Sequence, residues 1–366
     1  MTPDPKHTVV LDVMGADCEP ETIINGGIDA ARTIGDKLHV ILVGKRSCIE
    51  SVLDSIPDKP HNLSVAHAET AVPMHVSATE GVRMRDSSIA VGTRLVKEGK
   101  AIAFVSPGNT GAVMATALLT LGRIKGVSRP AISALFPSST ARPTVVLDVG
   151  ANAESKPQHL SQFAVMGSVY SSIIFGLESP RVGLVSIGEE RSKGNELIFS
   201  AQELLKKSKI NFVGNIEGRD ILSGDVDVAV TDGFTGNILL KFAESIQPFL
   251  EKAIDRQVQT NIFSRFAVMM MLPFMRRMKG AFDYAQYGGA PLLGLNGIIV
   301  ICHGSSNAKA ISRAVVTAKE MANQRITERI HDELVTNHFG SDHGVKDKSQ
   351  NIRNGIVCPT GSDDQR

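Results

Sequence analysis

One local pattern recurs along most of this 366-residue chain: a short continuous apolar run, a loop rich in Gly, Asn and Asp, and then a helix-forming segment. Apolar runs without alternation are typical of strands that are buried on both faces, and strands that alternate with helices form largely parallel sheets. The pattern therefore predicts an α/β fold. The expected strands are 8–12, 39–43, 64–68, 101–105, 131–136, 144–149, 182–187, 211–213, 226–230 and 297–302.

The helices expected between these strands include one long charged helix over 79–98 and a final helix that ends near 330. We expect residues 1–335 to form a single α/β catalytic domain. Within it, 245–290 is expected to protrude as a helical segment that contacts a second subunit or a membrane. Residues 336–366 are polar and rich in Gly, Asp and Ser, which predicts a mobile tail.

The composition excludes several classes of protein. Lys and Arg (39) balance Asp and Glu (38), and Trp is absent, so nucleic-acid binding by bulk charge or by aromatic stacking is not expected. The four cysteines are scattered without a CxxC pair, which argues against a structural zinc site and suits a reducing compartment. The short polar N-terminus and the lack of a long apolar run predict a soluble cytoplasmic protein.

The loop Ser106–Gly111 lies between an apolar strand and a helix, a place where free backbone N–H groups favour an anion such as phosphate. Parallel strands place such loops beyond their carboxyl ends, so we expect the polar loops to share one site. No Walker or GxGxxG motif is present, so a dinucleotide or nucleoside triphosphate is not indicated. The predicted phosphate-binding residues are Ser106, Gly108, Thr110, Gly111, Asp12, Asp148, Asp232 and Gly233.

A second set of polar residues in these loops is predicted to take part in catalysis. They are Lys193, Asn109, Asn152, Asn237 and His303. Each has a structural alternative: asparagines and aspartates often cap loops, and a histidine after an apolar strand is often a structural one. Lys193 is the strongest functional candidate, because a cation beside glycines at a strand end suits a phosphate.

Eight ordered motifs between residues 8 and 330 resemble the bacterial phosphate acyltransferases, also called acyl-ACP:phosphate transacylases. The motifs are 12–17, 106–111, 121–126, 147–152, 187–196, 214–220, 232–237 and 288–294. The resemblance implies a three-layer α/β/α fold with a mostly parallel sheet, isocitrate/isopropylmalate dehydrogenase-like and related to phosphotransacetylases, in a homodimer. It also implies that inorganic phosphate attacks the thioester of a long-chain acyl-ACP, without a metal or an organic cofactor. The resulting acyl phosphate would serve a downstream membrane glycerol-3-phosphate acyltransferase in phospholipid biosynthesis.

This reaction suggests a hypothesis for the site. The loop Ser106–Gly111 and Lys193 hold phosphate, one of the three asparagines polarises the thioester carbonyl, and His303 helps the thiolate leave. Two other functions stay open: a short-chain phosphotransacetylase that uses coenzyme A, and a catalytically inactive acyl-ACP binder. The second is prompted by departures from the motifs, such as Pro107 and Ala90.

The segment 262–275 is apolar almost all round and is followed by cations, but it is too short to span a bilayer. It predicts either a dimer or core helix, or an apolar tip that enters the membrane surface while the cations meet anionic lipid. The resemblance favours the tip, and hence a cytoplasmic protein at the inner face of the cell membrane. The predicted membrane-contact residues are Phe263, Phe266, Met270, Met271 and Leu272.

Overall fold

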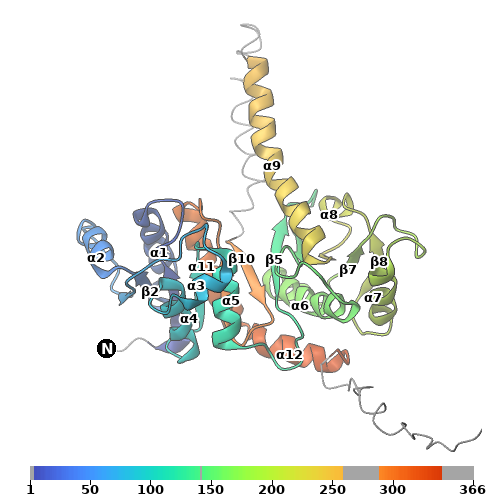
Figure 1. Cartoon of the computed structure of the whole chain (residues 1–366), viewed down its shortest axis with the longest axis horizontal. Coiled ribbons are helices and arrows are strands. Elements are labelled where there is room, and N and C mark those ends of the chain that lie inside the picture. The colour runs from blue at the N-terminus through green and yellow to red at the C-terminus, as the bar shows by residue number, and fades with distance from the viewer. Residues whose placement is uncertain (1–3, 141, 259–287, 340–366) are drawn as a thin grey trace, which may run out of the picture.

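The computed structural model describes residues 4–140, 142–258 and 288–339 of the chain (Figure 1). The strands are β1 (Thr8–Asp12), β2 (His39–Gly44), β3 (Leu63–His67), β4 (Ala103–Ser106), β5 (Ala131–Phe136), β6 (Thr144–Leu147), β7 (Val182–Val185), β8 (Phe212–Ile216), β9 (Val228–Val230), β10 (Ala290–Leu293) and β11 (Ile298–Ile301). The helices are α1 (Pro20–Ile34), α2 (Arg46–Asp54), α3 (Ala78–Arg83), α4 (Ser88–Lys97), α5 (Thr110–Leu121), α6 (Pro157–Phe175), α7 (Glu196–Lys206), α8 (Asp220–Ser223), α9 (Gly233–Val258), α11 (Ala308–Asn323) and α12 (Ile326–Thr336), with short 3₁₀ turns at Pro5–His7 and Gly35–Lys37.

All described strands join one sheet in the order β3-β2-β1-β4-β11-β10-β5-β6-β9-β7-β8. Most neighbours are parallel, as predicted, but β10 is antiparallel to β11 and to β5, and β5 is antiparallel to β6. The strands β6, β9, β7 and β8 therefore run opposite to β1, β2, β3, β4 and β11. The expectation that all polar loops meet at one sheet edge is wrong, because this reversal divides the loops into two groups.

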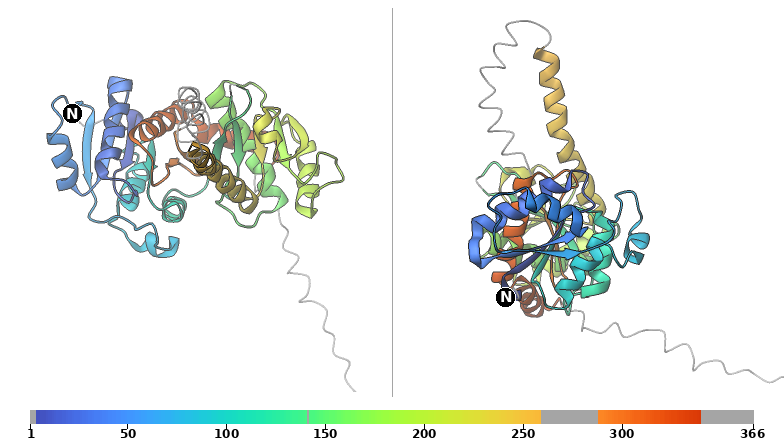
Figure 2. Two further views of the ribbon diagram at one scale, coloured as in Figure 1. Left: turned by 90° about the horizontal axis from the view of Figure 1, so that it is seen from above. Right: turned by 90° about the vertical axis from the view of Figure 1, so that its left-hand side faces the viewer.

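Successive strand residues point into two buried clusters on opposite faces of the sheet. Val9 and Leu11 belong to one cluster, whereas Val10 belongs to the other. The first cluster includes side chains of α1, α6 and α11, and the second includes side chains of α4 and α5. An end-on view shows helices on both sides of the strands in the N-terminal half (Figure 2). Continuous apolar runs are needed because both faces are covered.

Two expected helices are each divided into two. The segment 79–98 contains α3 and α4, because the side chain of Ser87 accepts a hydrogen bond from the N–H of Ala90 and caps a new helix. The final helical segment contains α11 and α12, separated at Arg325, whose φ of 53° is left-handed. The strand β10 was not expected, because Pro291 interrupts its sequence and glycines surround it.

The helix α9 projects from the body of the molecule (Figure 1). In the described part of the chain, no helix has the length and apolar character needed to cross a membrane. The predicted membrane-contact residues Phe263, Phe266, Met270, Met271 and Leu272 lie outside the described residues. So does the predicted tail from residue 340 onward.

Candidate functional site

The first group of polar loops follows the neighbouring strands β1, β4 and β11. The Ser106 hydroxyl donates to Oδ2 of Asp12 at 2.8 Å and accepts from the N–H of Gly108 at 3.1 Å. Asp12 also accepts from the N–H of Met14 at 3.0 Å. Both side chains are fully buried, and burial raises the pKa of Asp12 to about 6 although these hydrogen bonds lower it. Asp12 and Ser106 thus hold the loop Ser106–Gly111 in place through hydrogen bonds. Contact between their side chains and phosphate stays a prediction.

Asn109 is the N-cap residue of α5, and its side chain links this helix to the segment 73–76. Its Oδ1 accepts from the N–H of Ala112 at 2.9 Å, and its Nδ2 donates to the carbonyls of Pro73, Met74 and Val76 at 2.8–3.2 Å. The amide is therefore occupied by the protein itself. Thr110 is exposed and Gly111 is half-buried, and their N–H groups remain available, since a helix has no acceptor for its first N–H groups.

His303 follows β11 and is exposed. Its Nδ1 accepts from the N–H of Ser305 at 3.2 Å and lies 2.8 Å from the Ser305 hydroxyl. An accepting Nδ1 places the proton of a neutral ring on Nε2. The next residue, Gly304, accepts from the N–H of Asp17 at 2.9 Å, which ties the His303 loop to the loop after β1. The structure thus brings His303 into the first loop group.

The second group follows β6, β9 and β7, which are also neighbours. The buried carboxyl group of Asp148 accepts from the backbone N–H groups of Ile132, Gly150, Ala151 and Asn152 at 2.8–3.2 Å. Burial raises the pKa of Asp148, and the hydrogen bonds lower it. Since four backbone N–H groups and the side-chain amide of Asn152 donate to Asp148, its visible role is to fix the loop after β6.

Asn152 and Asn237 lie in this second group and differ in what their amides do. Nδ2 of Asn152 donates to the Pro130 carbonyl at 2.8 Å and to Asp148 at 2.9 Å, so both amide hydrogens have acceptors. Asn237 is exposed, and its side-chain amide makes no hydrogen bond within the described part of the chain. Its Oδ1 lies beside the backbone of Gly150, 3.4 Å from where a Cβ would stand. Among the three predicted asparagines, Asn237 is the one whose amide is available.

Asp232, Gly233 and Gly236 bring the start of α9 against the loop after β6. The Asp232 carboxyl group accepts from the N–H and hydroxyl of Thr235 at 2.9 and 2.8 Å. A Cβ on Gly233 would lie 2.4 Å from the carbonyl oxygen of Asn152, and one on Gly236 would lie 1.8 Å from the Asp148 carbonyl oxygen. These glycines allow a close backbone contact that any side chain would prevent.

Lys193 follows β7 and is exposed. Its carbonyl accepts from Nδ2 of Asn215 at 3.1 Å, which fixes the backbone and leaves the ammonium group at the surface. The strand β7 is six positions from β4 in the sheet, about 30 Å of sheet width. The structure therefore places Lys193 with the second loop group and does not bring it beside Ser106–Gly111, as the shared phosphate site required.

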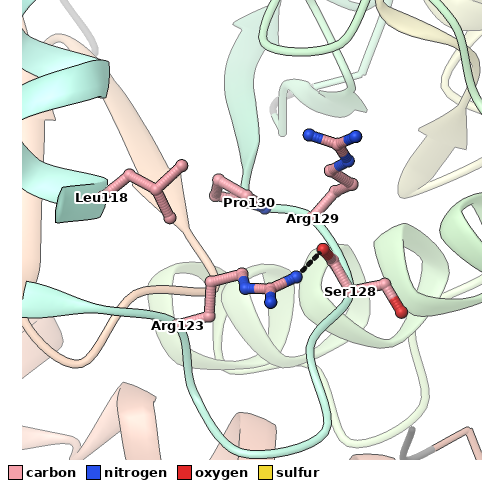
Figure 3. Close-up of a pocket in the computed structure, with 5 residues that line it drawn as sticks. All are labelled: Leu118, Arg123, Ser128, Arg129 and Pro130. Carbon is pink, nitrogen blue, oxygen red and sulfur yellow. Dashed lines mark hydrogen bonds between the residues drawn. The ribbon is translucent and has the colours of Figure 1, made fainter.

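A cavity of about 560 Å³ lies between α5 and the start of β5 and is lined by Leu118, Arg123, Ser128, Arg129 and Pro130 (Figure 3). The hydrogen bond from Asn152 to the Pro130 carbonyl connects it to the second loop group. Neither Arg123 nor Arg129 was predicted as a site residue: Arg123 lies in the motif 121–126 but was given no role, and Arg129 lies outside the motifs. Within the described residues, no group of three His, Cys, Asp or Glu side chains is arranged to hold a metal.

Comparisons with known proteins show similarity along most of the chain. Residues 7–329 match the model of a family described as "Fatty acid synthesis protein". The chain is 48% identical over 345 residues to a phosphate acyltransferase of Desulforamulus reducens, covering 93% of this chain and 99% of the relative. It is 44% identical over 329 residues to a phosphate acyltransferase of Halothermothrix orenii, covering 89% of this chain and 98% of the relative.

Solved structures of other proteins share the fold at low sequence identity. A phosphotransacetylase from Streptococcus pyogenes superposes with a TM-score of 0.60 at 19% identity, covering 87% of this chain and 95% of that one. A 4-hydroxythreonine-4-phosphate dehydrogenase from Klebsiella pneumoniae superposes with a TM-score of 0.52 at 12% identity, covering 86% of this chain and 99% of that one. These likenesses show an α/β fold with a mostly parallel sheet.

Proposed function

Because this chain belongs to the phosphate acyltransferase family, we propose that it transfers a long-chain acyl group from acyl carrier protein to inorganic phosphate. The observation that carries the proposal is the identity of 44–48% to phosphate acyltransferases along nearly the whole chain. The match to a fatty acid synthesis family model supports a long-chain donor. We also infer the finer fold description, a three-layer dehydrogenase-like α/β/α arrangement, from the packing of helices on both sheet faces.

The proposed step is a nucleophilic acyl substitution. A phosphate oxygen attacks the thioester carbonyl carbon, a C–O bond forms, and the C–S bond breaks. The electron pair of that bond leaves with the thiolate, which takes up a proton. The protein has to hold the anion near the carbonyl and stabilise the oxyanion that develops, for which placed N–H donors are effective.

The geometry favours particular residues for these tasks. The N–H groups of Thr110 and Gly111 at the start of α5 are the best-placed backbone donors in the first loop group. Asn237 is the amide proposed to polarise the carbonyl, because Asn109 and Asn152 already donate to protein oxygens. Because several strands separate the two loop groups, one step cannot draw on both, and we propose two alternative centres. In the second group, Lys193 attracts the phosphate towards Asn237. In the first group, Thr110 and Gly111 hold the phosphate and His303 protonates the leaving thiolate through Nε2.

The test is incubation of palmitoyl-ACP with the purified chain, with and without phosphate, followed by assay of free carrier thiol. We expect thiol release that depends on phosphate and a matching yield of acyl phosphate. Absence of phosphate-dependent release would overturn the proposal. Faster turnover of acetyl-CoA than of palmitoyl-ACP would instead support the short-chain phosphotransacetylase.

We also propose that the protein acts as a homodimer through α9. Phe234, Ile238, Phe242 and Phe249 recur on one face of this helix and are 53–69% exposed. An apolar stripe of this size is typical of an interface, and its continuity along a projecting helix suits pairing with the same helix of a second copy. Sedimentation of Phe242→Glu should show a monomer. The control Val335→Glu, on an exposed apolar site of α12, should remain dimeric.

Peripheral association with the inner face of the membrane remains part of the proposal. It rests on the apolar sequence of 262–275 and the cations that follow it. Flotation with anionic liposomes tests it: Met270→Glu should reduce the bound fraction. Unchanged binding of that variant would contradict a role for this segment.

A further inference from the structure

The cavity beside α5 has the chemistry of a phosphoryl-binding site. Its lining contains two arginines and no acidic residue, and Leu118 and Pro130 contribute apolar walls. In the close-up, the two guanidinium groups extend from the two ends of the segment that connects α5 to β5, and both lie at the cavity (Figure 3). Arginine is well suited to phosphate because its planar donors match two oxygens at once.

The cavity walls are firmly held. Gln162, fully buried in α6, accepts from the N–H of Ser128 at 2.8 Å and donates to the carbonyls of Gly126 and Phe339 at 2.8 and 2.7 Å. The backbone of Arg123 is fixed by a 2.8 Å hydrogen bond from Asn296 to its carbonyl. Such support fixes the position of the arginine backbones before a ligand binds.

The two arginines differ in what they already contact. The guanidinium group of Arg123 donates to the carbonyl of Ser128 and is thereby oriented along the cavity wall (Figure 3). Arg129 is exposed and makes no side-chain hydrogen bond or ion pair with any described residue. The charge of Arg129 acts on His159. Burial lowers the pKa of His159, and the positive charges of Arg129 and Lys156 lower it further. The positive charges of Arg129 and Lys156 therefore both act at this end of α6.

We propose that this cavity binds a phosphoryl group of a substrate, with Arg129 as the main ligand and Arg123 as a second. The inference rests on the proposed function, which supplies two phosphoryl groups: the attacking inorganic phosphate and the phosphodiester of the pantetheine arm that carries the acyl thioester. The location of the cavity suits either phosphoryl group, because the hydrogen bond from Asn152 to Pro130 places the cavity next to the second loop group.

The first arm of the test compares Arg129→Gln and Arg123→Gln with the wild-type enzyme in titrations of inorganic phosphate. The second arm compares palmitoyl-phosphopantetheine with palmitoyl-pantetheine, which lacks the phosphate. If the cavity holds inorganic phosphate, Arg129→Gln raises the KM for phosphate by roughly 10- to 100-fold, the usual value of a charged hydrogen bond. If it holds the arm, the variant loses the wild-type preference for the phosphorylated donor and keeps its KM for phosphate.

Arg32→Gln is the matched control, since Arg32 is an exposed arginine in α1 that donates to the Asp58 carbonyl. Arg32→Gln should change neither the KM for phosphate nor the preference for the phosphorylated donor. Thermal melting should show that all variants are folded. Arg129→Lys should restore part of the affinity. The inference is overturned if both Gln variants stay within twofold of Arg32→Gln in both arms. If the wild-type chain shows no phosphate-dependent thiol release, calorimetric titration of phosphate and of 4′-phosphopantetheine into wild type and Arg129→Gln still decides whether the cavity binds a phosphoryl group.

Discussion

The hydroxyl group of Ser106 donates a 2.8 Å hydrogen bond to the carboxyl group of Asp12, and neither side chain is exposed to solvent. The pair joins the end of β1 to the end of β4, where the first loop group begins. A buried carboxylate without a cationic partner is costly, which is why the pKa of Asp12 rises to about 6. This pair thus makes the stability of the loop depend on pH.

The first prediction concerns that dependence. With a pKa of 3.8 in the unfolded chain and about 6 in the folded protein, the folded state binds more protons between these values. Its stability is therefore complete at acid pH and falls as pH rises through 6, by about 3 kcal/mol for this group. Asp12→Asn cannot titrate, so the stability difference between the variant and wild type should shift in favour of the variant between pH 4 and pH 7.

Urea unfolding of both proteins at several pH values measures this difference, and other titrating groups cancel in the comparison. Parallel stability curves for wild type and Asp12→Asn would contradict the prediction. A constant offset between them would mean that the carboxyl group has the same pKa in the folded and unfolded states.

The second prediction concerns the close contact between α9 and the loop after β6. A Cβ on Gly236 would stand 1.8 Å from the Asp148 carbonyl oxygen, so Gly236→Ala requires the backbone to move. We expect a loss of unfolding free energy of about 3 kcal/mol, near the upper range of overpacking. Gly218→Ala is the control, because the nearest atom to its Cβ would be 4.0 Å away. Equal melting temperatures for the two variants would disprove the steric role.

Much of this fold could be predicted from local sequence. The strands Thr8–Asp12 and Ala131–Phe136 have the bounds that their apolar runs predicted. The reversal of sheet direction at β10 could not be predicted, because Ala290–Leu293 is short and its pairing with β5 and β11 is a long-range property. The division of the polar loops into two groups follows from that reversal, and so the separation of Lys193 from Ser106 was also beyond local reasoning.

The site was predictable as a set of loops but not as a set of roles. The Gly, Asp and Asn pattern identified the polar strand ends, although Thr110 and Gly111 belong to the first turn of α5 and 233–237 belong to α9. Whether an asparagine amide is free to bind substrate depends on carbonyl groups that are distant in sequence. The carbonyl of Val76 accepts from Asn109, and that of Pro130 accepts from Asn152. Arg129 carries no local signature, and its cavity becomes visible only when the folded chain brings Leu118 of α5 near Pro130 at the start of β5.

The third prediction separates the asparagines. Asn237→Ala should reduce kcat by roughly 100- to 1000-fold, the usual cost of losing one oxyanion donor, with an unchanged melting temperature. Asn109→Ala should lower the melting temperature, because it removes a helix cap and leaves three carbonyls without their donor. Asn211→Ala, an exposed site that donates to Ser179, should alter neither kcat nor stability appreciably. Wild-type turnover by Asn237→Ala would exclude it as the oxyanion donor.

The fourth prediction concerns Gln162, which supports the cavity from α6. Gln162→Leu keeps the approximate size of the side chain but removes three hydrogen bonds, leaving the N–H of Ser128 and two carbonyls unsatisfied. We expect a loss of unfolding free energy of about 3 kcal/mol or more, since each buried unpaired group costs about 1 kcal/mol or more. Gln202→Leu is the matched control, because this buried glutamine in α7 makes one such bond, to Asn215, and should cost about a third as much. If Arg129 binds a phosphoryl group, Gln162→Leu should also raise the same KM that Arg129→Gln raises, because the arginine loses its fixed position. Equal stability of the two leucine variants would show that the loop 126–128 does not depend on Gln162.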